Sequence, residues 1–188
     1  PPEDMALNVP SRMQQRLHTL AKEWTQGVST PQEQMARMQA KLRTFEYTLD
    51  SGPKVQEPLM HFLFERKAGH CEYYASALAL LGRTLGIPTR VATGYRVRER
   101  NAFYDFHIAR QRDAHAWTEA WVDGAWRRYE ATPAGLAFPP PSSLTQAWEA
   151  LSVALAESSG ARGALAGVIA LLVFFLWWGR RRRVEVGD

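Results

Sequence analysis

Residues 67–75 read KAGHCEYYA and contain Cys71, the only cysteine of the 188-residue chain. The residues that follow carry a helical stripe and then two stop signals: Ala75, Leu78, Leu85, Gly86 and Pro88. This spacing places Cys71 at the N-terminus of a helix. Because unpaired backbone N–H groups and the helix dipole favour an anion there, we expect a lowered thiol pKa and a nucleophilic thiolate.

A nucleophilic thiolate needs a base and a group that orients the base. The Asp-Gly pair at 123–124 is a two-residue hairpin signal between residues 115–122 and 126–131, which are rich in strand formers. A turn at this pair brings His115 close to Glu130 on one side of the sheet, at a distance that a hydrogen bond can span. Glu130 would then fix the tautomer of the His115 imidazole and stabilise its charged form.

Apolar residues at helical spacing predict helices in the first part of the chain. Ser11 can cap a helix that ends near Gly27, and the capping box at 30–33 starts a second one, with Pro31 at its first position. Pro58 begins a further short helix. Both long apolar stripes are interpreted as core packing.

Strand formers dominate later, over 87–97, 107–111, 115–122 and 126–131, and residues 45–49 alternate as a short extended segment would. Helices followed by an antiparallel sheet define the α+β class.

Composition limits the classes of function. Hydrophobic residues make up 46 % of the chain, which is enough for a core, and the length allows one globular domain plus a further segment. The formal net charge of +4 includes four arginines at 180–183, so it gives no case for nucleic-acid binding. A single cysteine cannot form an intrachain disulfide. The chain begins Pro-Pro and shows no signal peptide, so we expect a fragment of a longer protein.

Residues 163–179 are uncharged and mostly aliphatic or aromatic. As a helix they would be about 25 Å long, near the lower limit for a bilayer core of about 30 Å. Trp177 and Trp178 at one end, followed by the four arginines, predict a transmembrane helix whose C-terminal end is cytoplasmic. The Cys71 domain would then be periplasmic or extracellular. Gly163 and Gly167 form a GxxxG motif, a weak indication of a homodimer through this helix.

Four motifs, in order, resemble the core of bacterial transglutaminase-like proteins, and the membrane-anchored TgpA-type proteins most closely. They are GHC at 69–71, GIPTR at 86–90 with GY at 94–95, HAWTE at 115–119, and YEATP at 129–133. The resemblance implies a papain-like transglutaminase core in which the cysteine helix packs on an antiparallel sheet. It assigns the nucleophile to Cys71, the base to His115 and the acid to Glu130. The family usually has Asp where this chain has Glu130, so the longer side chain needs a shifted strand or another rotamer.

By this resemblance the chain is a cysteine acyltransferase that attacks a carboxamide or peptide carbonyl through a thioester. Its partner would be a protein or peptide substrate, cell-envelope material included, and it would use no cofactor or metal. The expected organisation is a helical region (1–44), a catalytic core (45–135), a linker (136–162), the transmembrane helix (163–179) and a cytoplasmic basic tail (180–188).

Other interpretations stay open at this point. The same chemistry with water as acceptor gives a cysteine protease or amidase. A chain of this fold without catalytic activity would be a module that binds peptide or cell-wall material. A zinc site built from His70, Cys71, His107 and His115 lacks the short paired spacing that zinc ligands show. Glu119 shares a face with His115 and is the second choice for the orienting acid.

Overall fold

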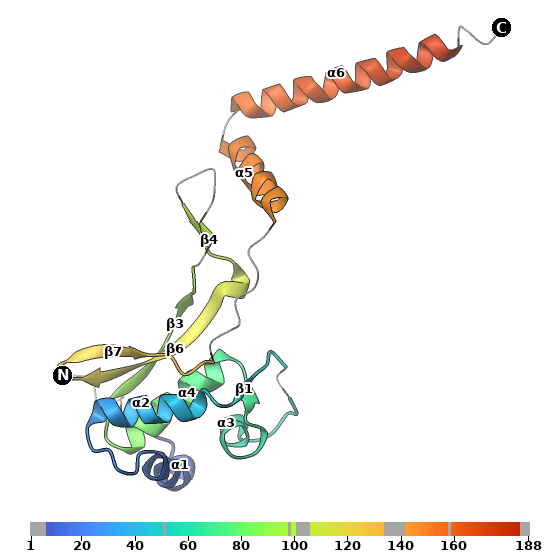
Figure 1. The fold of residues 1–188 in the computed structure, drawn as a ribbon. Coiled ribbons are helices and arrows are strands. Elements are labelled where there is room, and N and C mark those ends of the chain that lie inside the picture. The colour runs from blue at the N-terminus through green and yellow to red at the C-terminus, as the bar shows by residue number, and fades with distance from the viewer. Residues whose placement is uncertain are drawn as a thin grey trace. The chain divides into compact units, whose positions relative to one another are not determined.

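The computed structural model describes residues 7–50, 52–97, 99–100, 106–133, 142–157 and 159–184. The chain divides into two compact units (Figure 1). The first contains Pro1–Val97 and Ala109–Phe138, and the second contains Arg98–Ile108 and Pro139–Asp188.

Two amphipathic helices begin the first unit, as the apolar spacing predicts. Helix α1 spans Ser11–Trp24 and helix α2 spans Pro31–Leu42. Thr30 caps α2 by accepting a hydrogen bond from the backbone N–H of Glu33, so the predicted cap is confirmed. The expected cap at Ser11 is wrong by one residue, because Pro10 holds the N-cap position and makes no side-chain cap there.

Helix α4 spans Cys71–Thr84, so the predicted helix start at Cys71 is confirmed. The short helix α3, Pro58–His61, continues into a π-helical turn, η2, over Phe62–Arg66 and leads towards it. Helix α4 ends before Gly86, whose φ of 77° suits glycine. Helix α4 packs beside α1 and α2 (Figure 1), and its buried side chains share one apolar core with theirs.

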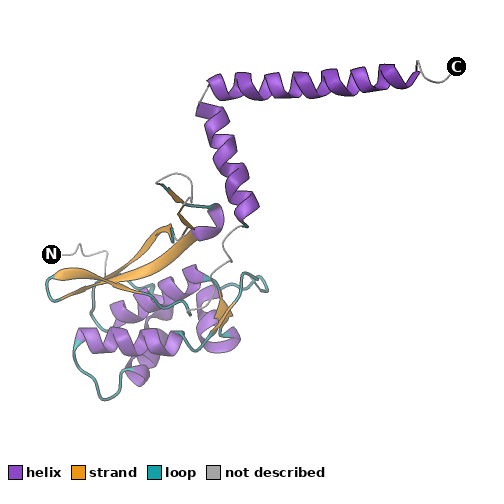
Figure 2. Ribbon diagram, turned by 45° about the horizontal axis from the view of Figure 1, so that its top comes forward, coloured by secondary structure: helices purple, strands orange, loops and turns teal. Residues whose placement is uncertain are grey.

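A three-stranded antiparallel sheet follows in the order β3-β6-β7, with β3 over Thr89–Tyr95, β6 over Ala114–Val122 and β7 over Ala125–Tyr129. In Figure 2 the helices of the first unit gather on one face of this sheet. Small side chains allow α4 to approach β6 closely: Ala75, Ala79, Ala116 and Ala120 are all buried. The Thr118 hydroxyl also donates to the Ala75 carbonyl at 2.8 Å. The helix that carries Cys71 is therefore fixed against the strand that carries His115.

The β6–β7 hairpin has the register predicted from the sequence. Trp121 pairs with Trp126 and Thr118 pairs with Tyr129, as a two-residue turn requires. Asp123 and Gly124 have φ values of 54° and 74°, and two positive φ values are typical of a type I′ turn.

The predicted strand over 107–111 is only partly correct. Strand β5 covers His107–Ile108 and pairs with β4, Glu99–Arg100, whereas Gln111–Asp113 forms a 3₁₀ turn, η3. The Asp113 side chain accepts from the Arg110 backbone N–H at 2.8 Å, and this local bond closes the turn. A short parallel pair, β1 (Glu46–Tyr47) and β2 (Ala68–Gly69), confirms the extended segment expected near residue 45.

The second unit holds β4, β5 and two helices, α5 over Ser143–Glu157 and α6 over Ser159–Val184. The predicted transmembrane stretch, 163–179, lies within α6. No helix in the described part of the chain is long and apolar enough to cross a membrane, so this prediction is not confirmed. The first six residues of the expected linker, 136–141, lie outside the described residues.

Leu78 tests the packing that holds α4 in place. We expect Leu78→Ala to lower the free energy of unfolding by about 2–5 kcal/mol, because the change leaves a cavity at a side chain that is 0 % exposed. Leu49 is 67 % exposed, so Leu49→Ala should change this energy by less than about 0.5 kcal/mol. Urea unfolding followed by tryptophan fluorescence measures both. Equal losses in the two variants would contradict the assigned core.

Candidate active site

Cys71 lies half-buried in the first turn of α4. The residues before it are tied to the N-terminal part of the chain, because Gly69 pairs with Tyr47 and accepts from the Thr48 backbone N–H at 3.0 Å. A Cβ atom on Gly69 would lie 3.0 Å from the Tyr73 ring and 3.1 Å from the Phe62 ring. The glycine two places before the cysteine therefore allows a close approach of the backbone to these rings.

His115 comes from the second residue of β6 and is 8 % exposed. It pairs with Gly94 of β3, which carries no side chain that could cover it. The Trp117 ring stacks with the imidazole at a centroid distance of 6.4 Å. Trp117 also packs on Gly94, where a Cβ atom would lie 3.0 Å from the indole. The Trp117 ring therefore packs against both the His115 imidazole and Gly94, where the missing side chain leaves room for it.

Glu130 follows the last residue of β7 and reaches His115, as the hairpin register predicts. Its Oε2 lies 2.7 Å from His115 Nε2. Its Oε1 accepts the backbone N–H of Thr132 at 3.2 Å. The structure therefore brings together His115 and the longer carboxylate without displacing the hairpin register.

His115 and Cys71 interact, and each changes the pKa of the other. Burial raises the pKa of Cys71, but hydrogen bonds to the His115 side chain and the Ala116 backbone, with the charge of His115, lower it below its usual value. Burial lowers the pKa of His115, but its hydrogen bonds to Cys71 and Glu130 raise it above its usual value. These opposite shifts favour a thiolate–imidazolium pair near neutral pH.

Glu130 is held ionised. Burial raises its pKa, but hydrogen bonds from His115 and Arg96, with their charges, lower it to about 2. Its Oε2 lies 2.6 Å from Arg96 Nη2 and 3.4 Å from Arg128 Nη2. A carboxylate in these surroundings stays negative across the neutral range and stabilises a positive charge on His115.

Arg96 is the site residue that sequence reasoning did not assign to this cluster. None of the four sequence motifs includes Arg96, whereas its side chain reaches Glu130. The alternation of side chains along a strand could have predicted this position. Arg96 lies two residues beyond Gly94, the partner of His115, and therefore on the same face of the sheet as His115.

Glu119, the second choice for the orienting acid, is engaged elsewhere. Its Oε2 lies 2.7 Å from Arg90 Nη2, and its Oε1 accepts from the Trp117 indole at 3.3 Å. Burial raises the pKa of Glu119, but the bonds from Arg90 and Trp117 lower it below its usual value. Glu119 therefore anchors β3 to β6, and Glu130 alone of the two acids contacts His115.

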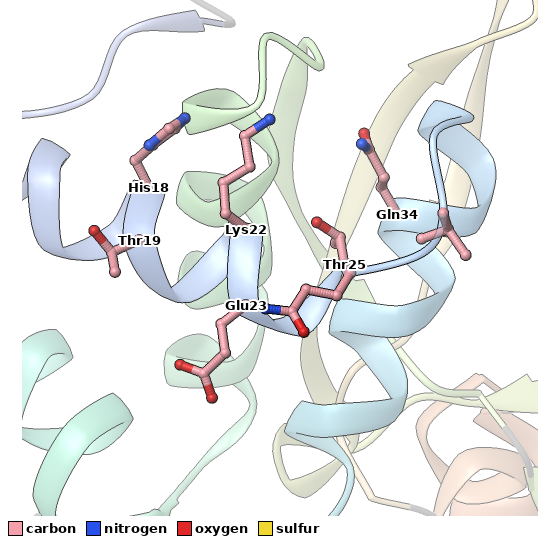
Figure 3. A pocket seen from close by; sticks show the side chains of 8 residues that line it. His18, Thr19, Lys22, Glu23, Thr25 and Gln34 are labelled. Atoms are coloured by element: carbon pink, nitrogen blue, oxygen red, sulfur yellow. The ribbon is translucent and has the colours of Figure 1, made fainter.

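In the part of the chain that the structure describes, neither a metal-ligand cluster nor the large open hollow involves the three predicted site residues. Within the ranges that the structure describes, no group of three or more His, Cys, Asp or Glu side chains is placed to hold a metal ion. An open hollow of about 710 Å³ lies at α1 and α2 (Figure 3). Its lining is mostly polar: His18, Thr19, Lys22, Glu23, Thr25, Gln26, Val28 and Gln34. Since none of the three predicted site residues lines it, the hollow is separate from the candidate chemistry.

A cysteine at a helix N-terminus, against a sheet that supplies histidine and an acid, defines the papain-like α+β core. The model of the transglutaminase-like superfamily matches residues 18–131, more than half of the chain. The chain belongs to this superfamily, as its four sequence motifs predict.

Relatives of known name support the same assignment. The chain is 35 % identical over 117 residues to a protein-glutamine gamma-glutamyltransferase of Pseudomonas aeruginosa, covering 61 % of this chain and 18 % of that protein. It is 28 % identical over 139 residues to YebA, an uncharacterized protein of Bacillus subtilis, covering 69 % and 19 %. The chain thus spans less than a fifth of the length of either relative.

Solved structures give the same result for the fold. The periplasmic domain of TgpA from Pseudomonas aeruginosa aligns with a TM-score of 0.61 and 32 % identity, covering 67 % of this chain and 45 % of that one. A putative cysteine protease from Cytophaga hutchinsonii aligns with a TM-score of 0.52 and 26 % identity, covering 68 % and 41 %. The predicted resemblance to TgpA is confirmed.

The Cys71–His115 pair can be tested by alkylation, which reports on Cys71 alone because the chain has no other cysteine. We expect iodoacetamide to react rapidly with the wild type near pH 6, since the pKa of Cys71 is lowered by His115. In His115→Ala the reaction should need a pH near the ordinary thiol value of about 8.5. The measurement is the alkylation rate from pH 4 to 9. Identical profiles in the two proteins would show that the pair does not form.

The low pKa of Glu130 predicts that the free energy of unfolding depends on pH. A folded pKa of about 2, against about 4.3 for a free glutamate, stabilises the fold above pH 4.3, and this contribution is lost as pH falls towards 2. Glu130→Gln should therefore lower the free energy of unfolding by about 1–3 kcal/mol at pH 6, with a smaller loss at pH 3. Urea unfolding at both pH values measures this. A loss of equal size at pH 6 and pH 3 would refute the assigned ionisation.

Proposed function

We propose that this chain carries the catalytic core of a cysteine acyltransferase of the transglutaminase type. The observation that supports this most is the grouping of three side chains: His115 Nε2 lies 2.7 Å from Glu130 Oε2, and the interaction of His115 with Cys71 lowers the pKa of the thiol. The group contains a nucleophile with a lowered pKa, a base with a raised pKa and an ionised acid. Such a combination serves nucleophilic attack on a carbonyl group and is of little use for simple binding.

In the proposed first half-reaction, the Cys71 thiolate attacks the carbonyl carbon of a carboxamide. The C–N bond of the carboxamide breaks, His115 gives its proton to the leaving ammonia, and an acyl thioester remains on Cys71. In the second half-reaction a primary amine attacks the thioester. His115 takes the proton of the amine, an amide forms, and the Cys71 thiolate leaves.

The surroundings of Cys71 suit the charge that develops in both steps. The tetrahedral intermediate carries an oxyanion, which needs hydrogen-bond donors. Backbone N–H groups in the first turn of a helix lack intrahelical acceptors, and Cys71 is the first residue of α4. We assign one oxyanion donor to the Cys71 backbone N–H on this basis. Glu130 holds His115 in the tautomer that faces Cys71 and stabilises the imidazolium between proton transfers.

The relatives suggest a substrate class and a compartment. Because one of them is named a protein-glutamine gamma-glutamyltransferase, we propose a protein or peptide glutamine as acyl donor. Because the TgpA domain of similar fold is periplasmic, we propose that the Cys71 domain also works outside the cytoplasm, on protein or peptide material of the cell envelope. Membrane attachment through residues 163–179 and pairing of two such helices stay predictions from the sequence.

Hydrolysis by the same residues is the second candidate, and the similarity to a putative cysteine protease favours it. In that reaction water would resolve the thioester in place of an amine. The access of an amine or of water to the thioester decides between the two acceptors, and the residues that perform the first half-reaction are the same in both.

Activity on a glutamine-containing peptide, offered with a fluorescent primary amine, tests both candidates. We expect the full chain to incorporate the amine and release ammonia, with Cys71→Ala slower by about a thousandfold or more. His115→Ala should be similarly slow. The double variant should be no slower than either single one, because residues that act as a unit are not additive.

The controls separate the outcomes. Ammonia release without amine incorporation would favour hydrolysis. Lack of both in a sample with native stability would leave a silent peptide-binding module. Wild-type rates retained in Cys71→Ala would refute the cysteine mechanism altogether.

A further inference from the structure

A partly buried cation contacts the acid of the candidate triad. Arg96 Nη2 lies 2.6 Å from Glu130 Oε2, and the Arg96 side chain is only 25 % exposed. The same oxygen lies 2.7 Å from His115 Nε2. One carboxylate oxygen therefore lies between a guanidinium and an imidazole, so whatever fixes the guanidinium also fixes the oxygen that His115 contacts.

The sheet holds Arg96 in this position. The Arg96 backbone N–H donates to the Asp113 carbonyl at 2.8 Å, which extends the β3–β6 ladder one residue beyond Tyr95. Successive side chains alternate between the two faces of a strand, so Arg96 lies on the same face as Gly94, the partner of His115. The short contact thus follows from backbone pairing and does not depend on a loop.

Arg128, the other cation near this carboxylate, is less suited to hold it. Its Nη2 lies 3.4 Å from Glu130 Oε2, and its side chain is 52 % exposed. Its guanidinium carbon lies 4.4 Å from the centre of the Trp117 ring, so it packs mainly on that indole. Of these two cations, Arg96 makes the shorter and less exposed contact.

We propose that Arg96 is a positioning residue for the Cys71–His115–Glu130 reaction: its guanidinium holds the Glu130 carboxylate against His115. This inference rests on the proposed function. Glutamate has three side-chain torsions that must be fixed for one oxygen to stay at the imidazole, and a planar, multidentate donor such as arginine restricts them better than an ammonium does.

Arg96 acts on His115 in two opposite ways, and this opposition makes the proposal testable. Through Glu130 it favours the charged imidazole, because it keeps the carboxylate in contact. Through its own charge it lowers the pKa of His115, whereas the contacts with Cys71 and Glu130 raise it. If positioning prevails, loss of Arg96 weakens the thiolate–imidazolium pair. If direct repulsion prevails, loss of Arg96 strengthens it.

Other charged or titratable groups also face this cluster from the elements packed around it. They are Arg43 after α2, which donates to the Glu130 backbone carbonyl at 2.9 Å, Tyr47 of β1, His70 before α4, Glu72 of α4, and Arg128 of β7. Since each of them stays in place in an Arg96 variant, a change in the pH profile reports on Arg96.

The test is the pH profile of Cys71 alkylation in the full chain. We expect Arg96→Met to move the midpoint of thiolate formation upwards by about one pH unit, a tenfold loss at pH 6, with an unchanged rate at pH 9. Arg96→Lys keeps the charge but not the planar fork, and should move the midpoint upwards by a smaller amount. Arg90→Met is the matched control. Arg90 lies on β3, which ends directly before Arg96, but it pairs with Glu119 of β6 and not with Glu130, so this variant should leave the midpoint in place.

A Glu130→Ala background completes the design. There Arg96→Met should cause no further upward movement, since no carboxylate is left to hold. Three results would overturn the proposal: a downward shift in Arg96→Met, no shift in it, or an equal upward shift in both backgrounds. If the wild type itself has a midpoint near about 8.5, the thiolate–imidazolium pair is missing. That result would refute the proposed function, and with it the role of Arg96. Thermal unfolding of each variant verifies that it is folded.

Discussion

The close packing of α4 on β6 is the constraint on which the candidate site depends. Side chains no larger than alanine or threonine line much of this contact. On the neighbouring strand β3, Thr89 lies so close to Gly82 of α4 that a Cβ atom on the glycine would lie 2.8 Å from the threonine methyl group. The Thr118–Ala75 hydrogen bond fixes how far the helix can slide along the strand. Because Cys71 and His115 lie on these two elements, their contact is set by the core and not by flexible loops.

Local sequence signals were sufficient to predict the β6–β7 hairpin and the start of α4. The Asp-Gly turn fixed the hairpin register, and a two-residue type I′ turn leaves little choice of pairing. Apolar spacing placed the start of α4 at Cys71. The contact between His115 and Glu130 followed from these local rules, because both residues belong to one hairpin.

Interactions between distant segments were harder to foresee. Arg96 and Glu130 meet only because β6 lies between their strands, and an arginine near a strand end is more often solvated. Residues 107–111 read as a strand because strand propensity ignores local competition. There Asp113 bonds the Arg110 backbone and closes a turn instead. In both cases the sequence does not reveal the hydrogen-bond partner of a polar side chain: Glu130 for Arg96, and the Arg110 backbone for Asp113.

The hairpin turn has a consequence for how this chain can vary. Side chains on a strand change face with every residue, and Glu130 follows the strand that begins right after the turn at 123–124. A single residue inserted at the start of β7, behind an unchanged two-residue turn, would therefore direct the carboxylate away from His115, although the insertion lies at the opposite end of the hairpin. An insertion of two residues there would preserve the facing side chains. The number of residues between the turn and Glu130 is thus subject to a parity rule imposed by the chemistry at the other end of the strands.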